Sequence, residues 1–248
     1  MNPVIRQIVK VCFFLLLVIP LALLAPDVAF ANPLTAENFS AHYQEVIQKV
    51  NALLSEKSKL KSSGRHQNSR HFLRDKNRLT PSQRHLKEEK KYLETIAELR
   101  DALISIYAER TKKKSPEQQL NMESTRLAIG LVNETKRLRG QYKSFAIPIV
   151  HNMLIDVGIK KRGACKHWAE DLLEYLKPIK RDFFYVTWGE ANPKKMNEHN
   201  VAVLYPNFSN FYEGLIIDPW RTAGKPFWIR VTDDKHYKWN PWNYYGVY

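Results

Sequence analysis

The feature that most constrains the fold is the uneven distribution of aromatic residues along the chain of 248 residues. All six tryptophans lie after residue 165, and eight of the twelve tyrosines lie at residue 175 or later. The chain before residue 145 is instead rich in Leu, Lys, Glu, Gln and Arg. Helix-forming residues followed by aromatic and β-branched ones predict an α+β protein, with helices first and strands in the second half.

Three amphipathic helices are expected before residue 145. The first follows Thr35, and the other two begin at T-P-S-Q (residues 80–83) and S-P-E-Q (residues 115–118). Each of these two motifs offers a hydroxyl N-cap, a proline at the first helical position and Gln at the third, which is a capping box. We expect the apolar stripes to pack on each other or on a neighbouring domain. The stripes are Phe39, Tyr43, Val46, Ile47, Val50, Leu53 and Leu54; Leu86, Leu93, Ile96, Ala97, Leu103, Ile104 and Tyr107; and Leu120, Leu127, Leu131, Leu138 and Tyr142.

The first 31 residues have the layout of a secretory signal peptide. Arg6 and Lys10 precede a run of 16 uncharged residues, 11–26, and Ala29 and Ala31 occupy small-x-small positions. The run is shorter than the roughly 20 residues that span a bilayer as a helix. We therefore expect cleavage after Ala31 and an exported chain, periplasmic or secreted. If the signal stays uncleaved, the chain is membrane-associated instead.

The chain is strongly basic, with 39 Lys+Arg against 25 Asp+Glu and a net charge of +14. Residues 57–91 alone hold twelve Lys or Arg and three acids. This basic loop has two interpretations: a solvated loop, or a contact for anionic lipid or another envelope polyanion. Nucleic acid is not expected as a partner, because a signal peptide precedes the stretch and no aromatic residues interleave it for base stacking.

Cys165 is the one cysteine that remains after removal of the predicted signal peptide. A single cysteine forms no intramolecular disulfide, so its thiol is either buried and structural or present for its chemistry. A short helix is expected to end near Gly158, and a second to begin at Cys165 and stop before Pro178. The unpaired N–H groups of a helix N-terminus stabilise a thiolate, which favours the reactive interpretation.

His199 is the expected base for this thiol. It opens the predicted strand H-N-V-A-V-L-Y, whereas His167 lies two residues after Cys165, which is about 200° around a helix. His167 is therefore expected to pack elsewhere. Glu198 and Asn200 adjoin His199, so their side chains should point to the other face of the strand.

Asp218 is the expected partner of His199. It ends the apolar run G-L-I-I, which places a carboxylate at a strand terminus. Asp233 and Asp234 are competitors, but they lie in a polar turn without a preceding buried run. A carboxylate in this position holds the imidazole in one tautomer and stabilises its protonated form.

Three segments together resemble the transglutaminase-like branch of the papain-like cysteine hydrolases. They are R-G-A-C-K-H-W-A (162–169), E-H-N (198–200) and I-D-P-W-R (217–221). The resemblance implies a catalytic domain over residues 143–248, in which the cysteine-bearing helix packs on an antiparallel sheet. An α-helical region, residues 32–142, would precede it. The strands would lie at about 183–188, 200–205, 214–218 and 227–231.

The resulting hypothesis is a Cys165–His199–Asp218 triad that acts on an amide bond of a peptide or protein, by hydrolysis or transamidation. The backbone N–H of Cys165 and either Asn152 or the Trp188 indole would bind the oxyanion. No cofactor is expected, and no second metal-ligand spacing supports a metal site at the triad. The alternative is a non-enzymatic binding or scaffold protein of the cell envelope, with a degenerate domain of the same fold.

Overall fold

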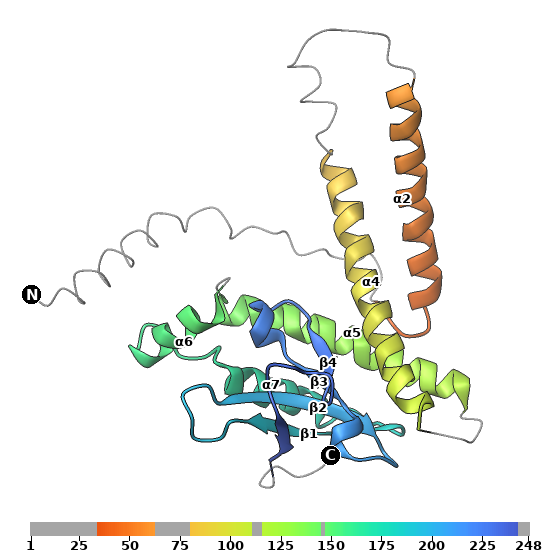
Figure 1. The fold of residues 1–248 in the computed structure, drawn as a ribbon. Coiled ribbons are helices and arrows are strands. Elements are labelled where there is room, and N and C mark those ends of the chain that lie inside the picture. Colours follow the sequence, from red (N-terminus) through yellow and green to blue (C-terminus); the bar gives the residue numbers. More distant parts are fainter. Residues whose placement is uncertain (1–33, 63–79, 111–115, 145–146, 243–248) are drawn as a thin grey trace, which may run out of the picture. The chain divides into compact units, whose positions relative to one another are not determined.

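The structure is a computed structural model that describes residues 34–62, 80–110, 116–144 and 147–242, without side chains for 53–62. Residues Leu34–Tyr248 form one compact unit, and the predicted signal peptide, residues 1–31, lies outside the described residues. The architecture is α+β (Figure 1). The helices are α2 (Phe39–Ser62), α4 (Pro81–Ala108), α5 (Glu117–Tyr142), α6 (Pro148–Asp156) and α7 (Cys165–Leu176), and the 3-10 turns are η1 (Phe211–Glu213) and η2 (Pro219–Thr222). None of the described helices has both the length and the apolar character needed to cross a bilayer.

Helices α2, α4 and α5 bury the apolar stripes predicted from the sequence. α4 packs against both α2 and α5, and their shared core is mainly aliphatic. Leu86 and Ile104 lie at the margin of this core and stay partly exposed. The predicted stripes of α4 and α5 are therefore confirmed, whereas in α2 Ile47 does not join this core. The buried members are Phe39, Val46, Leu93, Ile96, Ala97, Leu103, Tyr107, Leu120, Leu127, Leu131, Leu138 and Tyr142.

The two predicted capping boxes have different outcomes. At α4 the Thr80 hydroxyl accepts a hydrogen bond from the Gln83 N–H at 3.2 Å, and the Gln83 side chain accepts one from the Thr80 N–H at 3.0 Å. α5 begins one residue later than expected, because Pro116 itself takes the N-cap position, without a side-chain cap. Ser115 lies outside the described residues.

The basic stretch 57–91 is not a loop over its whole length. Residues 57–62 continue α2, and residues 81–91 form the first turns of α4. Residues 63–79 lie outside the described residues. The helix-forming Lys, Glu and Leu at the two ends of the stretch explain why both neighbouring helices extend into it.

The five strands form one antiparallel sheet in the order β4-β3-β2-β1-β5. The four predicted strands are present. β5 was not predicted, because it has three residues, one of them Pro241, which is compatible only with the sheet edge that it occupies. The strand bounds are β1 (Phe184–Ala191), β2 (His199–Pro206), β3 (Leu215–Ile217), β4 (Trp228–Arg230) and β5 (Trp239–Pro241).

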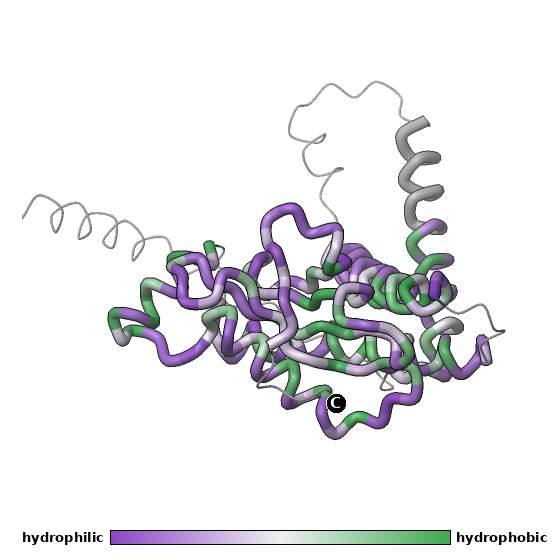
Figure 2. Tube along the Cα trace, turned by 60° about the horizontal axis from the view of Figure 1, so that its bottom comes forward, coloured by the Kyte–Doolittle hydropathy of each residue, from purple (hydrophilic) through white to green (hydrophobic). Residues whose placement is uncertain are grey.

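Strand β2 is buried along its whole length, because it has a neighbour on each side and is covered on both faces. Alternate residues point to opposite faces of a strand. Ala202 and Leu204 join the core shared with α7 and the long helices, whereas Val201 and Val203 join a smaller cluster around Trp239. Figure 2 shows the hydrophobic strands at the centre of the unit and hydrophilic residues in many of the connecting loops.

The helical region and the sheet share one core. The ring of Tyr107 on α4 contacts those of Phe183 and Phe184, at centroid distances of 5.4 and 6.0 Å. The carboxylate of Glu123 on α5 accepts hydrogen bonds from the Asp182 and Phe183 N–H groups, at 2.7 and 3.1 Å. The boundary expected at residues 142 and 143 therefore falls inside a single compact unit.

Candidate active site

Cys165 is the first residue of α7, and the loop before it is shaped by a glycine. Gly163 has φ +117°, a conformation that L side chains rarely adopt. A Cβ at this position would also lie 2.2 Å from Nε2 of His151. Glycine is therefore required on two counts for the chain to approach Cys165 as it does. The thiol is buried, and its Sγ lies 3.8 Å from the carbonyl oxygen of Glu198.

His167 caps the helix that carries Cys165. Its Nδ1 accepts hydrogen bonds from the N–H groups of Gly163 and Ala164, at 3.1 and 3.2 Å. Burial lowers the pKa of His167, and the charges of Arg162 and Lys166 lower it further. The ring is thereby kept neutral, as an accepting nitrogen requires. This role agrees with the expectation that His167 packs against the protein and does not act as the base.

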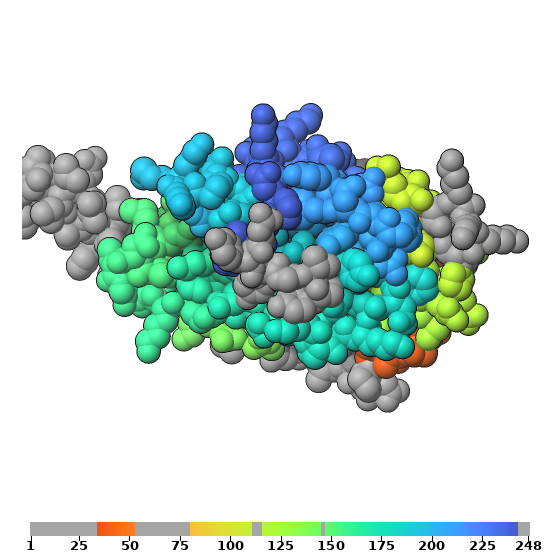
Figure 3. Space-filling view, turned by 90° about the horizontal axis from the view of Figure 1, so that it is seen from below, coloured from red at the N-terminus to blue at the C-terminus, as the bar shows by residue number. Residues whose placement is uncertain are grey.

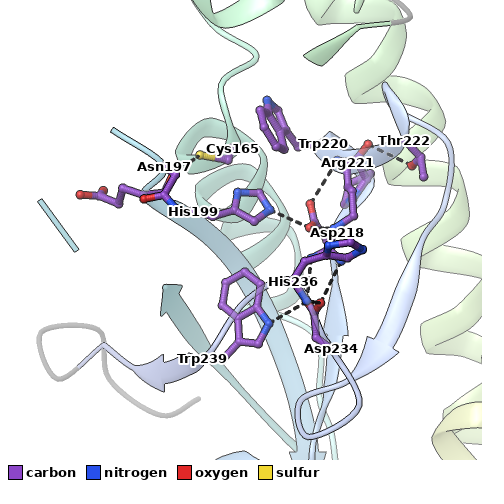
Figure 4. Close-up of polar contacts among 12 residues, drawn as sticks. Cys165, Asn197, His199, Asp218, Trp220, Arg221, Thr222, Asp234, His236 and Trp239 are labelled. Carbon is purple, nitrogen blue, oxygen red and sulfur yellow. Dashed lines mark hydrogen bonds and ion pairs between the residues drawn. The ribbon is translucent and has the colours of Figure 1, made fainter. Parts of the chain in front are cut away.

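His199 lies between Cys165 and Asp218 (Figure 4). Its Nε2 is 2.7 Å from Oδ2 of Asp218, and its side chain is 1% exposed. Among the described residues, the buried Nδ1 has no hydrogen-bond partner. Burial opposes protonation of the ring, but the hydrogen bond and charge of Asp218, together with the neighbouring Cys165, outweigh it and raise the pKa of His199 to about 9. The imidazole is therefore held in its charged form at neutral pH.

Three aromatic rings enclose the His199 imidazole. The centroids of Trp220, Tyr237 and Trp239 lie 4.7, 4.8 and 5.4 Å from that of the imidazole. These rings limit its rotation and exclude water, so that its interactions with Asp218 and Cys165 are made in a low-dielectric environment.

Asp218 lies where the sequence places it, directly after β3. It is the N-cap of η2, and its Oδ1 accepts a hydrogen bond from the Arg221 N–H at 3.3 Å. Its Oδ2 accepts both the His199 hydrogen bond and one from Nε of Arg221, at 3.0 Å. The backbone N–H and the guanidinium of Arg221 thus fix the orientation of the Asp218 carboxylate.

A second carboxylate, Asp234, completes a buried network that the sequence analysis missed. Arg221 donates to Asp234 through Nη2 at 2.7 Å, and Asp234 also accepts hydrogen bonds from the His236 N–H and the Trp239 indole, each at 2.9 Å. Burial would raise the pKa of Asp234, but these donors outweigh it and hold the pKa at about 2. The I-D-P-W-R motif places Arg221 three residues after Asp218, which was a usable signal. Asp234 was set aside because it lies in a polar turn.

The two candidates for the second oxyanion donor have different environments. The Trp188 indole N–H donates to Oδ1 of Asn200 at 2.8 Å inside the core, so Trp188 does not fit this role. Oδ1 of Asn152 accepts a hydrogen bond from the Trp220 indole at 3.2 Å. This contact places the Asn152 amide beside a ring that covers His199, and Asn152 stays a candidate.

No protein-family model, curated protein or solved structure matches the chain. The site combines a thiol at a helix N-terminus, a buried imidazole with a raised pKa and a carboxylate with a fixed orientation. Such groups can perform nucleophilic acyl transfer.

A pocket of ≈ 340 Å³ lies away from these residues, between the end of α4, the η1 turn and β4. Two ion pairs cross its lining, Arg230 with Glu109 and Arg110 with Glu213. Cys165, His199 and Asp218 do not line this pocket, so it is separate from the candidate active site.

Proposed function

We propose that the chain is a thiol acyl-transfer enzyme of the transglutaminase-like branch of the papain-like cysteine hydrolases. The observation that carries this proposal is the position of His199, buried between a thiol and a carboxylate with Nε2 2.7 Å from Asp218. The order of the elements supports it as well. The helix that bears the nucleophile packs on an antiparallel sheet, with His199 opening β2 and Asp218 following β3.

In the first step the Cys165 thiolate attacks the carbonyl carbon of an amide, and the C=O electron pair moves to the oxygen. The backbone N–H of Cys165 and the amide of Asn152 would donate hydrogen bonds to that oxyanion. The protonated His199 then gives its proton to the leaving nitrogen, the C–N bond breaks, and an amine leaves. An acyl thioester on Cys165 remains.

In the second step His199 takes a proton from the acceptor. Water gives hydrolysis and a free carboxylate, whereas an amine gives transamidation and a new amide. The acceptor oxygen or nitrogen attacks the thioester carbonyl, the C–S bond breaks, and Cys165 leaves as the thiolate. Asp218 stabilises the imidazolium that recurs in both steps. We propose a peptide or protein substrate outside the cytoplasm, in keeping with the N-terminal signal.

The test is the pH dependence of Cys165 alkylation by iodoacetamide, a reagent small enough for a thiol that is 7% exposed. Cys12 is replaced by Ser in all variants, so that one thiol is measured. We expect half-maximal alkylation well below pH 8.5, about the free-thiol value. His199→Ala should raise this midpoint most, because it removes the positive charge beside the sulfur, and Asp218→Asn should raise it less.

His85, an exposed histidine on α4, supplies the matched control. His85→Ala should leave the alkylation profile unchanged. His167→Ala should raise the alkylation midpoint less than His199→Ala does, because the His167 ring binds the backbone N–H groups of Gly163 and Ala164 and does not pair with Asp218. A profile that stays the same in His199→Ala would reject the triad and favour the envelope scaffold. A peptide library with and without an added amine, analysed by mass spectrometry, then separates hydrolysis from transamidation.

A further inference from the structure

Helix α6 carries a row of exposed aliphatic side chains. Ile149, Met153 and Val157 follow one another at intervals of four residues, and they are 65, 59 and 68% exposed. Residues four apart lie on the same side of a helix, so these three form one stripe. Ile147, directly before the helix, and Ile159, after it, are exposed as well, at 58 and 70%. We call residues 147–161 the α6 surface. Figure 3 shows the green atoms of this part of the chain at the margin of the face in view.

The opposite side of α6 is firmly attached to the candidate active site. His151 is buried against Gly163, and its Nε2 lies 3.0 Å from the Arg162 carbonyl oxygen in the loop that leads to Cys165. Asn152 accepts the Trp220 indole hydrogen bond. The aliphatic stripe is therefore exposed on a helix that is docked through its other face, and poor packing of the helix does not account for it.

Positive charge borders the stripe. Residues 143–161 contain three lysines, Lys143, Lys160 and Lys161, against Asp156 as their one acid. Lys160 is held by hydrogen bonds from its Nζ to the carbonyl oxygens of Tyr142 and Lys143, at 2.7 and 2.6 Å. Lys143 and Lys161 are exposed. Lys160 and its sequence neighbour Lys161 therefore lie close to Lys143, and a cluster of lysines borders the apolar surface, on a chain whose net charge is +14.

We propose that the α6 surface docks on an anionic lipid bilayer, with the aliphatic stripe in the interface and the lysines at the headgroups. Protein interfaces are enriched in aromatic residues and Arg and depleted in Lys. The α6 surface has the opposite composition, with Ile, Met and Val beside lysines. Amphipathic helices that lie in a membrane interface combine such an apolar face with Lys or Arg. Docking would bring the loop before Cys165 close to the membrane surface.

The experiment measures co-sedimentation of the full chain with vesicles of phosphatidylcholine alone or mixed with phosphatidylglycerol. We expect binding to the anionic vesicles that weakens as salt is added. Replacing Ile149 and Met153 together by Asp should lower partitioning about tenfold or more, because it removes buried apolar area and adds negative charge. Lys161→Glu should lower it about fivefold or more.

Met196→Asp is the matched control, since Met196 is a fully exposed apolar residue between β1 and β2. It should bind as the unchanged chain does, and urea unfolding should verify that every variant is folded. The proposal is overturned if the Ile149 and Met153 variant binds normally, because binding would then come from the N-terminal apolar run or from residues 57–91. It is also overturned by equal binding to both vesicle types, by no binding, or by self-association that Ile149→Asp abolishes.

Discussion

Helix α4 and the sheet region hold their charged side chains in opposite environments. On α4, Lys90 and Glu94 pair at 2.6 Å on consecutive turns, and both side chains stay about one-third exposed. Beside the sheet, the side chains of Asp218 and Asp234 are at most 1% exposed, and Arg221 pairs with both. Water solvates the charges of Lys90 and Glu94, whereas the buried charges of Asp218 and Asp234 are stabilised by their protein partners alone.

This difference shows where each region is sensitive to substitution. An exposed ion pair contributes up to about 1 kcal/mol, because water solvates each partner when the other is removed. A buried pair leaves an uncompensated charge when one partner is lost. Helix α4 should therefore respond mainly to loss of apolar volume, and the sheet region to loss of single charges. Three predictions test this contrast, in order of decreasing effect.

The largest effect is expected from Arg221→Leu. It leaves two buried carboxylates without their shared cation, and we expect a loss of about 3–5 kcal/mol in the free energy of unfolding, measured by urea denaturation. Lys90→Leu is the matched control on α4. Lys90 pairs with Glu94 within the same helix and both side chains are about one-third exposed, so its loss should cost no more than about 1 kcal/mol.

Leu103→Ala sharpens the same comparison from the helical side. Leu103 is fully buried on α4, and its truncation should cost about 2–5 kcal/mol through lost burial and the cavity that remains. The alkylation of Cys165 should stay unchanged in the folded variant. Equal losses in the free energy of unfolding for Arg221→Leu and Lys90→Leu would show that burial of the Arg221 network adds nothing.

The second prediction concerns pH. The pKa of His199 is raised from 6.5 to about 9 in the folded chain, so the protonated ring stabilises the fold fully below about pH 6.5. This contribution, on the order of 3 kcal/mol, is lost as the pH rises through about 9. The urea midpoint should fall across that window in the unchanged chain. In His199→Gln the fall should be largely absent, and a fall of the same size there would assign the effect to another group.

The smallest effect is expected at the start of α4. Thr80→Ala removes the side-chain half of the capping box and should cost about 1 kcal/mol in urea denaturation, because one N–H of the first turn loses its acceptor. Ser82→Ala, in the same turn but without the capping role, is the control. A cost for Thr80→Ala as large as that for Arg221→Leu would remove the contrast between the two regions.

The sequence was sufficient to predict those features that depend on residues close to each other along the chain. The start of α4 followed from T-P-S-Q, and the end of α7 followed from Pro178. His199 and Asp218 were found because each lies at the end of an apolar strand. Asp234 was missed because Arg221, thirteen residues earlier, accounts for its burial, and no local pattern encodes that pairing. Trp188 was misjudged for the same reason, since its acceptor is Asn200 on the neighbouring strand.

The core shared by Tyr107, Glu123 and the strand residues has a consequence for how such a protein can evolve. The sheet and α7, if inherited without α4 and α5, would expose Phe183 and Phe184 and leave two backbone N–H groups just before β1 without their acceptor. Recombination between these parts would break both sets of contacts at once. The segment that holds Cys165, His199 and Asp218 is therefore expected to be inherited together with α4 and α5, and not as a separate unit.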